Sequence, residues 1–465
     1  MWFLALLILL NAFANNTSFV NNYRLYIAGM PLNVFDGLVV IGFIFAMVRP
    51  RGSANYVRTQ AMHPALLWML GLFVLATFGG LIGGASNGAS NRQVITSLRN
   101  FLVAPAALYL GYFLIANINS SRRMLYLHVA AGLLVSFMIV VFFKNKTETR
   151  TFSHLNDARA VAYISTYAGL AVALLFYSVS SGVKLLPLLL AWAAMGVCIV
   201  GQFATLSRSD WLAAMAAVMA AFVLLPKEQR VRSALRAGIA LPVLLASLWV
   251  GMYLGTQVSG KNMFKSVHEK MLSMLPGDRP GVKIKAWDTR LPGMLREVRK
   301  FAESPLIGGG FAIADTPQME GQYYVGLRHN TWTSTMAETG LFGFSAFALM
   351  IGSMIVVGWR MVRARTDQTT VLMGALGVST ACFFIVHGAA TMSFNQMRWG
   401  LPLFVTAGMV LRTRQMQLAL LEQAHAEQAY LDEQAGAHDY SMVPDGDGNG
   451  AAGHEPAFGN WYQTN

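Results

Sequence analysis

The sequence predicts an all-α polytopic membrane protein with about twelve transmembrane helices, and three observations support this fold class. Of the 465 residues, 55% are hydrophobic and only 12% are charged. Apolar runs of about 20 residues recur from one end of the chain to the other. The basic residues are concentrated in the connections between these runs. A chain of this kind meets lipid over most of its surface.

Each expected helix is an apolar segment long enough to cross most or all of about 30 Å of hydrocarbon at about 1.5 Å per residue. The expected helices are 1–14, 32–48, 63–83, 99–116, 124–143, 160–179, 185–204, 211–225, 237–256, 333–358, 370–390 and 399–411. The first of them lacks a basic n-region and a small-residue cleavage site, so it is interpreted as a spanning helix that is retained. Cys198 and Cys382 lie inside apolar runs, which indicates packing rather than a disulfide or metal site.

The distribution of arginine and lysine predicts the topology. With the N-terminus in the cytoplasm, every even-numbered connection obeys the positive-inside rule, and both termini are cytoplasmic. The cytoplasmic basic residues are Arg49, Arg51, Arg58, Arg122, Arg123, Lys184, Lys227, Arg230, Arg232, Arg236, Arg360, Arg363, Arg365, Arg412 and Arg414. The opposite connections also carry arginines, including Arg99 and Arg159 at predicted helix starts. These are either solvated charges or contacts to a polyanionic ligand such as a lipid diphosphate.

The formal net charge of +13 does not indicate nucleic-acid binding. The basic residues are spread between hydrophobic segments and form no patch interleaved with aromatic side chains. Membrane topology together with an anionic ligand explains this charge better.

The chain divides into four regions on this topology. Residues 1–256 hold the first nine helices, 257–332 form a large extracytoplasmic loop, 333–412 hold the last three helices, and 413–465 form a cytoplasmic, largely disordered tail. Within the loop, the spacing over 262–275 predicts an amphipathic helix at the membrane interface. The stretch 282–303 also has a helical pattern, in which Pro292 is expected to bend the helix or to start a second one. A further polar helical pattern covers 415–433.

Three short polar pieces fall on the extracytoplasmic face in this topology. The turn Ser207-Arg208-Ser209 joins two helices, Arg290 lies in the long loop, and Arg328-His329-Asn330 precedes the helix 333–358. Each piece has a structural reading when taken alone. The histidine can sit beside a helix N-cap, and an arginine at a helix end can simply extend its head group to the interface.

The order and spacing of several motifs reveal a family resemblance. Arg290 lies fifteen residues before a Pro-hydrophobic-hydrophobic-Gly-x-Gly turn, and His-Asn then opens a helix with a Glu-x-Gly-x-x-Gly pattern. The segments are Arg290-Leu291, Glu303-Ser304-Pro305-Leu306-Ile307-Gly308-Gly309-Gly310-Phe311, His329-Asn330-Thr331 and Glu338-Thr339-Gly340-Leu341-Phe342-Gly343. Together with Ser207-Arg208, they resemble the signature of the O-antigen ligase and polymerase superfamily. One departure is Met294, where the family often has tryptophan.

This resemblance implies a GT-C-like glycosyltransferase in the inner membrane of a Gram-negative bacterium. Its implied reaction transfers O-antigen from undecaprenyl diphosphate to lipid A-core on the periplasmic face, and its implied catalytic residues are His329, Arg290 and Arg208. Histidine suits a general base near neutral pH, and arginine binds phosphate oxygens in a two-pronged manner. Arg99 and Arg159 start predicted helices on the same face near bilayer depth, and they are expected, together with Arg328, to contact the lipid diphosphate.

The sequence predicts neither a metal nor an organic cofactor for this reaction. No DxD motif or His-x-x-x-His pattern occurs on the extracytoplasmic face, where Asp288 and Asp315 are isolated. The one DxD match, Asp445-Gly446-Asp447, falls in the predicted tail. No P-loop or Rossmann glycine pattern follows a predicted strand. We therefore expect a metal-independent reaction with arginines in the place of the metal.

The glycines and Glu338 favour a structural interpretation. Gly308-Gly309-Gly310 is better explained as a tight loop that re-enters the protein than as a phosphate cradle. Gly340 and Gly343 allow close helix packing, and Glu338 is expected to be a buried partner for a basic group.

Alternative functions remain open at this level. A polymerase of O-antigen repeats and a protein O-oligosaccharyltransferase would use the same donor and differ in the acceptor. A transporter or flippase is a further alternative, although the internal repeats common in transporters are not found.

Overall fold

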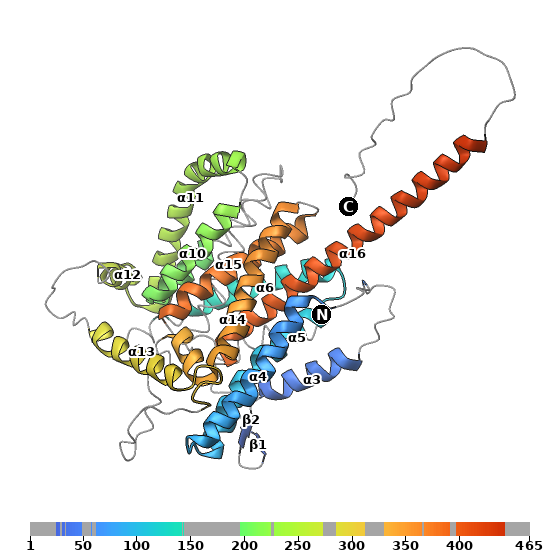
Figure 1. Ribbon diagram of the computed structural model, residues 1–465. Helices are drawn as coiled ribbons and strands as arrows, with labels where there is room; N and C mark the ends of the chain where they lie inside the picture. The colour runs from blue at the N-terminus through green and yellow to red at the C-terminus, as the bar shows by residue number, and fades with distance from the viewer. Residues whose placement is uncertain are drawn as a thin grey trace, which may run out of the picture. The chain divides into compact units, whose positions relative to one another are not determined.

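The computed structural model describes residues 25–27, 30–32, 34–48, 57, 62–141, 143, 196–224, 227–272, 285–311, 330–364, 367–390 and 397–441. Apart from the turns between helices, these residues are helical, as predicted, except for one short antiparallel hairpin of β1 and β2 in which Leu25 pairs with Leu32 (Figure 1). The strands are β1 (Leu25–Ile27) and β2 (Met30–Leu32). The named helices are α3 (Val34–Val48), α4 (Pro64–Ser86), α5 (Asn91–Phe113), α6 (Ile118–Val141), α10 (Arg208–Leu224), α11 (Lys227–Ser259), α12 (Met263–Leu272), α13 (Lys285–Glu303), α14 (Thr331–Ala364), α15 (Gln368–Ala390) and α16 (Met397–Ser441).

Several of these helices are suited to a bilayer. In the described part of the chain, four are long and apolar enough to cross a membrane by length and composition: Pro64–Ser86, Ile118–Val141, Thr331–Ala364 and Gln368–Ala389. Large apolar side chains on α4, such as Trp68 and Phe78, are exposed, as expected for a surface that meets lipid. The protein is therefore a membrane protein with several apolar helices. The predicted helices 1–14 and 160–179, and most of 185–204, lie outside the described residues.

The chain divides into two compact units, Met1–Gln417 and Leu418–Asn465. The second unit contains the C-terminal part of α16, whose side chains are mostly exposed. This confirms the polar helical pattern predicted for 415–433. All contacts described below lie within the first unit.

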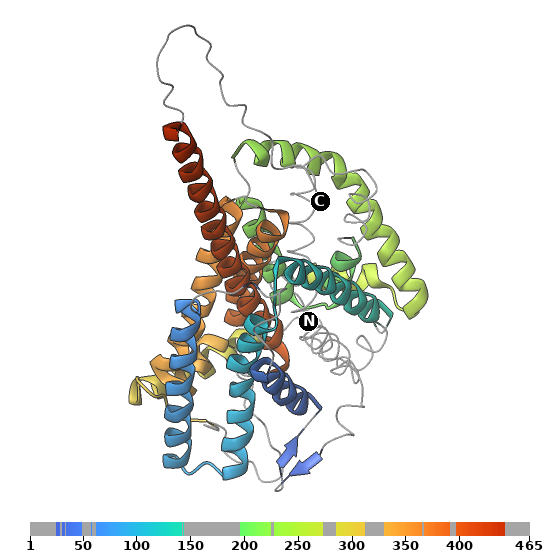
Figure 2. The ribbon, with the colours of Figure 1, turned by 90° about the vertical axis from the view of Figure 1, so that its right-hand side faces the viewer.

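Four helices of the first unit have an end in the same place. There α15 ends and α10 and α14 begin, as contacts from Asp210 to His387 and from Asn330 to Ala389 indicate, and α4 ends against residues 309–311, which bond to α14. We call this the site end. Figure 2 shows α4 and α5 as antiparallel neighbours, so α5 also begins near the end of α4.

A buried arginine lies at the opposite end of α4 and α5. Arg412 of α16 is 1% exposed and donates hydrogen bonds to the carbonyl oxygens of Val57 (2.8 Å) and Ile115 (3.3 Å). These bonds satisfy a cation that burial would otherwise destabilise.

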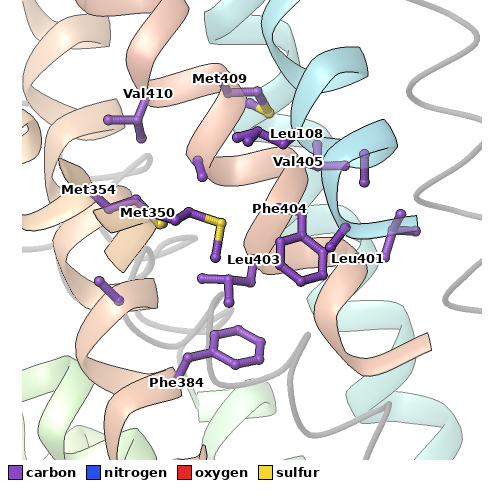
Figure 3. Packing of buried hydrophobic residues seen from close by; sticks show 14 of the residues in the cluster. Leu108, Met350, Met354, Phe384, Leu401, Leu403, Phe404, Val405, Met409 and Val410 are labelled. Atoms are coloured by element: carbon purple, nitrogen blue, oxygen red, sulfur yellow. The ribbon is translucent and has the colours of Figure 1, made fainter. Parts of the chain in front are cut away.

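The core between the two ends is built from aromatic, leucine and methionine side chains (Figure 3). Phe347 of α14 packs on Phe404 of α16, with ring centroids 5.8 Å apart. α5 and α16 approach through glycines, since a Cβ at Gly408 would lie 2.2 Å from the carbonyl oxygen of Leu108. Small residues permit this kind of close helix packing in membrane proteins. Cys198 and Cys382 are free thiols, as predicted.

The two helices predicted in the loop are present. Apolar residues of α12 are turned toward the protein: Met263 and Val267 are buried, and Met263 contacts Gly255 of α11. α13 continues through Pro292 as one helix instead of dividing there. It lies against the beginning of α14 (Figure 1), which brings the loop onto the site end.

Candidate functional site

Residues 304–311, which we call the glycine turn, follow α13 along the chain. Their backbone forms hydrogen bonds to the middle of α14. α14 is interrupted at Gly340, whose φ of 61° and ψ of −155° break the helical hydrogen bonding. The turn replaces those bonds: the amides of Gly309 and Gly310 donate to the carbonyls of Ala337 (2.7 Å) and Glu338 (3.1 Å), while the Leu341 amide donates to Pro305 (2.8 Å). Backbone amides and carbonyls of α14 that lose their helical partners at this break thus form hydrogen bonds with the glycine turn instead.

The same turn is pressed against α4. The Phe311 amide donates to the carbonyl of Gly80 (2.7 Å), and a Cβ at Gly310 would lie only 1.8 Å from the backbone nitrogen of Gly84. The amide of Gly308, like those of the two glycines after it, already donates to a backbone carbonyl. These amides are therefore occupied by the protein itself, which confirms the interpretation of the glycine motif as a tight loop rather than a phosphate cradle.

Asn330, the residue that follows His329, fixes the start of α14. Its Oδ1 accepts hydrogen bonds from the amides of Trp332 (2.9 Å) and Thr333 (3.2 Å), as an N-cap does. Its Nδ2 donates to the carbonyl of Ala389 at the end of α15 (3.2 Å) and lies 4.0 Å from the sulfur of Met294. Met294, where the family often has tryptophan, therefore contacts Asn330, the residue that follows the predicted base His329.

Glu297 fastens α13 to α14. Its carboxylate is 9% exposed and accepts hydrogen bonds from the hydroxyls of Ser334 (2.6 Å) and Thr333. The first turn of a helix also favours a nearby negative charge. Arg290, Met294 and Glu297 are spaced at i, i+4 and i+7 on α13, which is the spacing of one helix face. The backbone of Arg290 is consequently one turn from a contact with the start of α14.

The Ser207-Arg208-Ser209 turn is shaped by an unusual backbone. Leu206 has a φ of 52°, a left-handed conformation that costs a non-glycine residue about 1–3 kcal/mol. It is held in place because Trp211 donates its Nε1–H to the carbonyl of Gln202 (2.9 Å) and Thr205 donates its hydroxyl to the same oxygen (2.8 Å). α10 then begins at Arg208, which is exposed. Strain of this kind is concentrated at functional sites.

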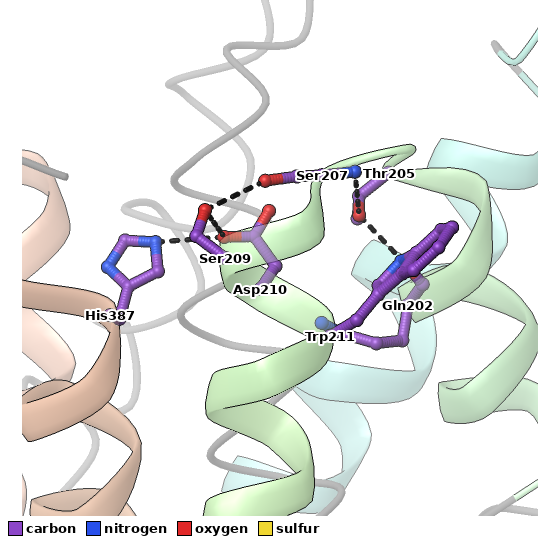
Figure 4. Close-up of polar contacts among 7 residues, drawn as sticks. All are labelled: Gln202, Thr205, Ser207, Ser209, Asp210, Trp211 and His387. Carbon is purple, nitrogen blue, oxygen red and sulfur yellow. Dashed lines mark hydrogen bonds and ion pairs between the residues drawn. The ribbon is translucent and has the colours of Figure 1, made fainter. Parts of the chain in front are cut away.

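A buried contact between a histidine and an aspartate continues this turn toward α15 (Figure 4). His387 Nε2 lies 2.9 Å from Asp210 Oδ1, and the two side chains are 1% and 3% exposed. The Ser209 hydroxyl lies 3.5 Å from the same carboxylate oxygen and 3.1 Å from the hydroxyl of Ser207. A polar chain therefore runs from the half-buried Ser207 to the interior of the helix bundle.

The structure accounts for some of the predicted site residues and not for others. Arg208 lies at the start of α10, and the backbone of Arg290 lies in α13. Arg99 is half-buried and lies inside α5, which begins at Asn91 rather than near 99 as predicted. Arg159, Arg328 and His329 lie outside the described residues.

Contacts connect the segments that carry these residues. Asp210 links the Arg208 turn to α15, Ala389 of α15 links to Asn330, and Asn330 and its neighbours link to α13. The predicted pieces on α10, on α13 and at the start of α14 thus belong to one continuous set of contacts. Among the described residues, no group of three or more histidine, cysteine, aspartate or glutamate side chains has an arrangement suited to a metal ion.

Three polar residues of this region, Asp210, Glu297 and His387, are absent from the predictions. His387 carried a usable signal, because it lies in the predicted apolar helix 370–390, and an ionisable residue in such a helix is a default candidate for function. Nothing in the sequence indicates that Asp210 contacts His387 or that Glu297 contacts Ser334. These residues become neighbours only because α10 packs on α15 and α13 packs on α14.

Residues 189–348 match the family model described as O-antigen ligase. The matched region contains α10 to α13, the glycine turn and the first part of α14. The helices and this match together describe a membrane protein in which residues 189–348 are similar to the O-antigen ligase family. The resemblance to the O-antigen ligase superfamily is thereby confirmed. No curated protein matches the chain.

Proposed function

We propose that this protein transfers O-antigen polysaccharide from undecaprenyl diphosphate to lipid A-core. The proposed location is the inner membrane of a Gram-negative bacterium, with both termini in the cytoplasm and the active site on the periplasmic face. One observation carries the proposal. The start of α10, α13 and the residue after His329 all belong to the region that matches the O-antigen ligase family, and contacts connect them, in part through His387 and Ala389 of α15, which lies outside that region.

The proposed reaction is a single displacement at the sugar carbon bonded to the diphosphate. A hydroxyl oxygen of lipid A-core forms the new bond to that carbon, and the bond from carbon to diphosphate oxygen breaks. His329 accepts the hydroxyl proton as general base, a role that contributes about 10²- to 10⁴-fold. Asn330 caps α14 and thereby restrains the chain at the point where His329 precedes it.

The diphosphate leaves with an additional negative charge, and Arg208 and Arg290 stabilise it in this proposal. Guanidinium groups stay charged at every physiological pH and can donate two parallel hydrogen bonds to phosphate oxygens. Interactions of this type accelerate a reaction to the extent that they strengthen in the transition state. Arg99, Arg159 and Arg328 are assigned to binding of the lipid diphosphate, and the reaction is proposed to need no metal.

The decisive assay uses purified protein in lipid with a lipid-linked glycan and lipid A-core, in EDTA and without ATP. We expect transfer under these conditions. His329→Ala should lower its rate by about 10²-fold or more, because the general base is lost. His268→Ala is the matched control, since His268 is an exposed histidine of α12 in the same loop. Equal rates for His329→Ala and the control contradict the base assignment.

Lysine substitutions test the role of the arginines. Arg208→Lys and Arg290→Lys keep the positive charge but lose the two parallel hydrogen-bond donors of the guanidinium group, so each should strongly lower the transfer rate. Arg299→Lys, at an exposed position of α13, should leave the rate unchanged. Wild-type rates for both site variants contradict diphosphate binding by these residues. Activity that requires added magnesium or manganese contradicts the metal-independent reaction.

Acceptor competition separates the related functions. Offering lipid A-core, a second lipid-linked glycan and a protein acceptor together should yield glycosylated lipid A-core. Elongated lipid-linked glycan identifies a polymerase, and modified protein identifies an O-oligosaccharyltransferase. Movement of the intact donor across the bilayer without transfer identifies a flippase.

A further inference from the structure

Asp210 and His387 form a buried polar pair to which the reaction proposed above assigns no role. Their contact of 2.9 Å joins the first turn of α10 to the last turns of α15 (Figure 4). Removing polar or ionisable groups from water is costly, so replacing such a pair by apolar residues is often neutral or stabilising. A buried pair is thus weak evidence of a contribution to stability, and its position requires another explanation.

Much of the packing between the two helices is made by residues other than the pair. α10 presents buried alanines along its length, including Ala213, Ala217 and Ala221, and contacts α15 extensively. The turn before α10 is held separately by Trp211 and Thr205, which both donate to Gln202. The pair adds a contact that defines how the first turn of α10 is rotated.

This rotation decides where Arg208 lies. Residues two apart on a helix do not face each other, so an inward Asp210 is associated with an outward Arg208. The observed burial agrees, because Asp210 is 2% exposed and Arg208 is exposed. His387 and the Ser209 hydroxyl also contact the Asp210 carboxylate, which is thereby engaged inside the protein rather than beside the arginine.

We propose that Asp210 and His387 are positioning residues that hold Arg208 toward the diphosphate of the lipid-linked donor, a role that rests on the proposed function. His387 stacks on Phe383, with ring centroids 5.2 Å apart and an interplanar angle of 18°, so its ring is fixed on α15. Two residues further along α15, Ala389 accepts the hydrogen bond from Asn330. The end of α15 therefore sets the position of the Arg208 turn relative to the start of α14, where the predicted base is attached.

The test combines substitutions at the pair with Arg208→Ala. Asp210→Ala and His387→Leu remove the contact, whereas His387→Gln keeps a donor near the position of Nε2. We expect Asp210→Ala and His387→Leu to raise the donor KM about tenfold and His387→Gln to recover most of this loss. In an Arg208→Ala background, the same substitutions should change the donor KM by less than about twofold, because they act through Arg208. His128→Leu is the matched control, as His128 is a buried histidine of α6 that bonds the carbonyl of Met124.

A role in folding alone gives a different pattern. It predicts a lower Tm, no recovery of donor KM by His387→Gln, and the same loss with or without Arg208. Either that pattern or an unchanged donor KM in Asp210→Ala and His387→Leu, with Arg208→Ala impaired, overturns the proposal.

Binding of undecaprenyl diphosphate alone, measured as the rise in Tm that it causes, separates this proposal from the proposed function. Wild-type protein that binds this lipid but transfers no glycan overturns the proposed function. The positioning role is still supported if Asp210→Ala and His387→Leu reduce the rise in Tm as Arg208→Ala does. Absence of any Tm rise in the wild type overturns both.

Discussion

Two junctions at the site end are built on opposite principles. The glycine junction, formed by residues 304–311, the kink at Gly340 and the end of α4, is made of backbone groups that leave no room for a Cβ. The polar junction, formed by residues 205–211 with His387, Ala389 and Asn330, is made of side-chain contacts. Both junctions contain residues of the region that matches the O-antigen ligase family, yet the first fixes the path of the chain and the second presents chemical groups. A shared motif therefore does not imply a shared role for all its residues.

The largest expected effect is at the glycine junction. Gly310→Ala places a Cβ 1.8 Å from the backbone nitrogen of Gly84, at a residue whose φ is 94°. Neither backbone can move without breaking the hydrogen bonds of the turn, so we expect a loss of about 3 kcal/mol or more, which prevents isolation of folded protein. The measurement is the yield and Tm of the purified variant.

Gly88→Ala is the matched control for this substitution. Gly88 also has a positive φ, 68°, but no atom lies within 4 Å of the site of its Cβ. Gly88→Ala should therefore lower the free energy of unfolding by only about 1 kcal/mol, the cost of placing alanine at a positive φ. Equal Tm values for the two variants would show that the close approach of the turn to α4 is not what requires glycine.

An intermediate effect is expected where α13 is fastened to α14. Glu297→Ala leaves the hydroxyls of Thr333 and Ser334 without their carboxylate acceptor, which should cost about 2 kcal/mol and lower the Tm. Under the proposed function, transfer should also fall because Arg290 is carried by α13. Glu303→Ala is the control: its pair with Lys300 (3.0 Å) is on the surface, so less than about 0.5 kcal/mol is expected. Comparable decreases of Tm in the two variants would show that Glu297 does not stabilise the packing of α13 on α14.

The smallest effect concerns a contact far from both junctions. Burial and, to a lesser extent, the charge of Arg414 lower the pKa of His63 below 6.5. Its Nδ1 accepts a hydrogen bond from the amide of Ala65 (3.3 Å) at the start of α4, and protonation abolishes this acceptor. Because the folded pKa is lowered, the stabilisation is complete above 6.5 and declines as the pH falls below that value.

We expect a loss of about 0.5 to 1 kcal/mol between about pH 7.5 and pH 5, the range expected for an N-cap. Tm measured across this range in wild type and in His63→Asn provides the test, since asparagine caps a helix without titrating. An identical pH dependence in both proteins would assign the effect to another group.

Much of the helical framework follows from the sequence, because lipid imposes a strong constraint. A segment in hydrocarbon must satisfy its backbone bonds internally, so a run of apolar residues is sufficient to predict a helix. The segments 63–83 and 370–390 were predicted almost as α4 and α15 are observed. The start of α5 was predicted eight residues late, because 91–98 is polar and its helical character depends on packing against α4. The interpretation of Gly308-Gly309-Gly310 as a tight loop follows from the backbone freedom of three consecutive glycines.

The sequence by itself determined the class of protein, the approximate helices and the motifs that carry Arg208, Arg290 and His329. Only the tertiary structure decided the partners: Gly340 with Pro305 to Gly310, Glu297 with Ser334, and Asp210 with His387. The physical reason is that hydropathy and backbone hydrogen bonding act over a few neighbouring residues, which the sequence lists in order. A buried charge or a backbone break is instead satisfied by whichever segment packs against it, and that segment can lie far away along the chain.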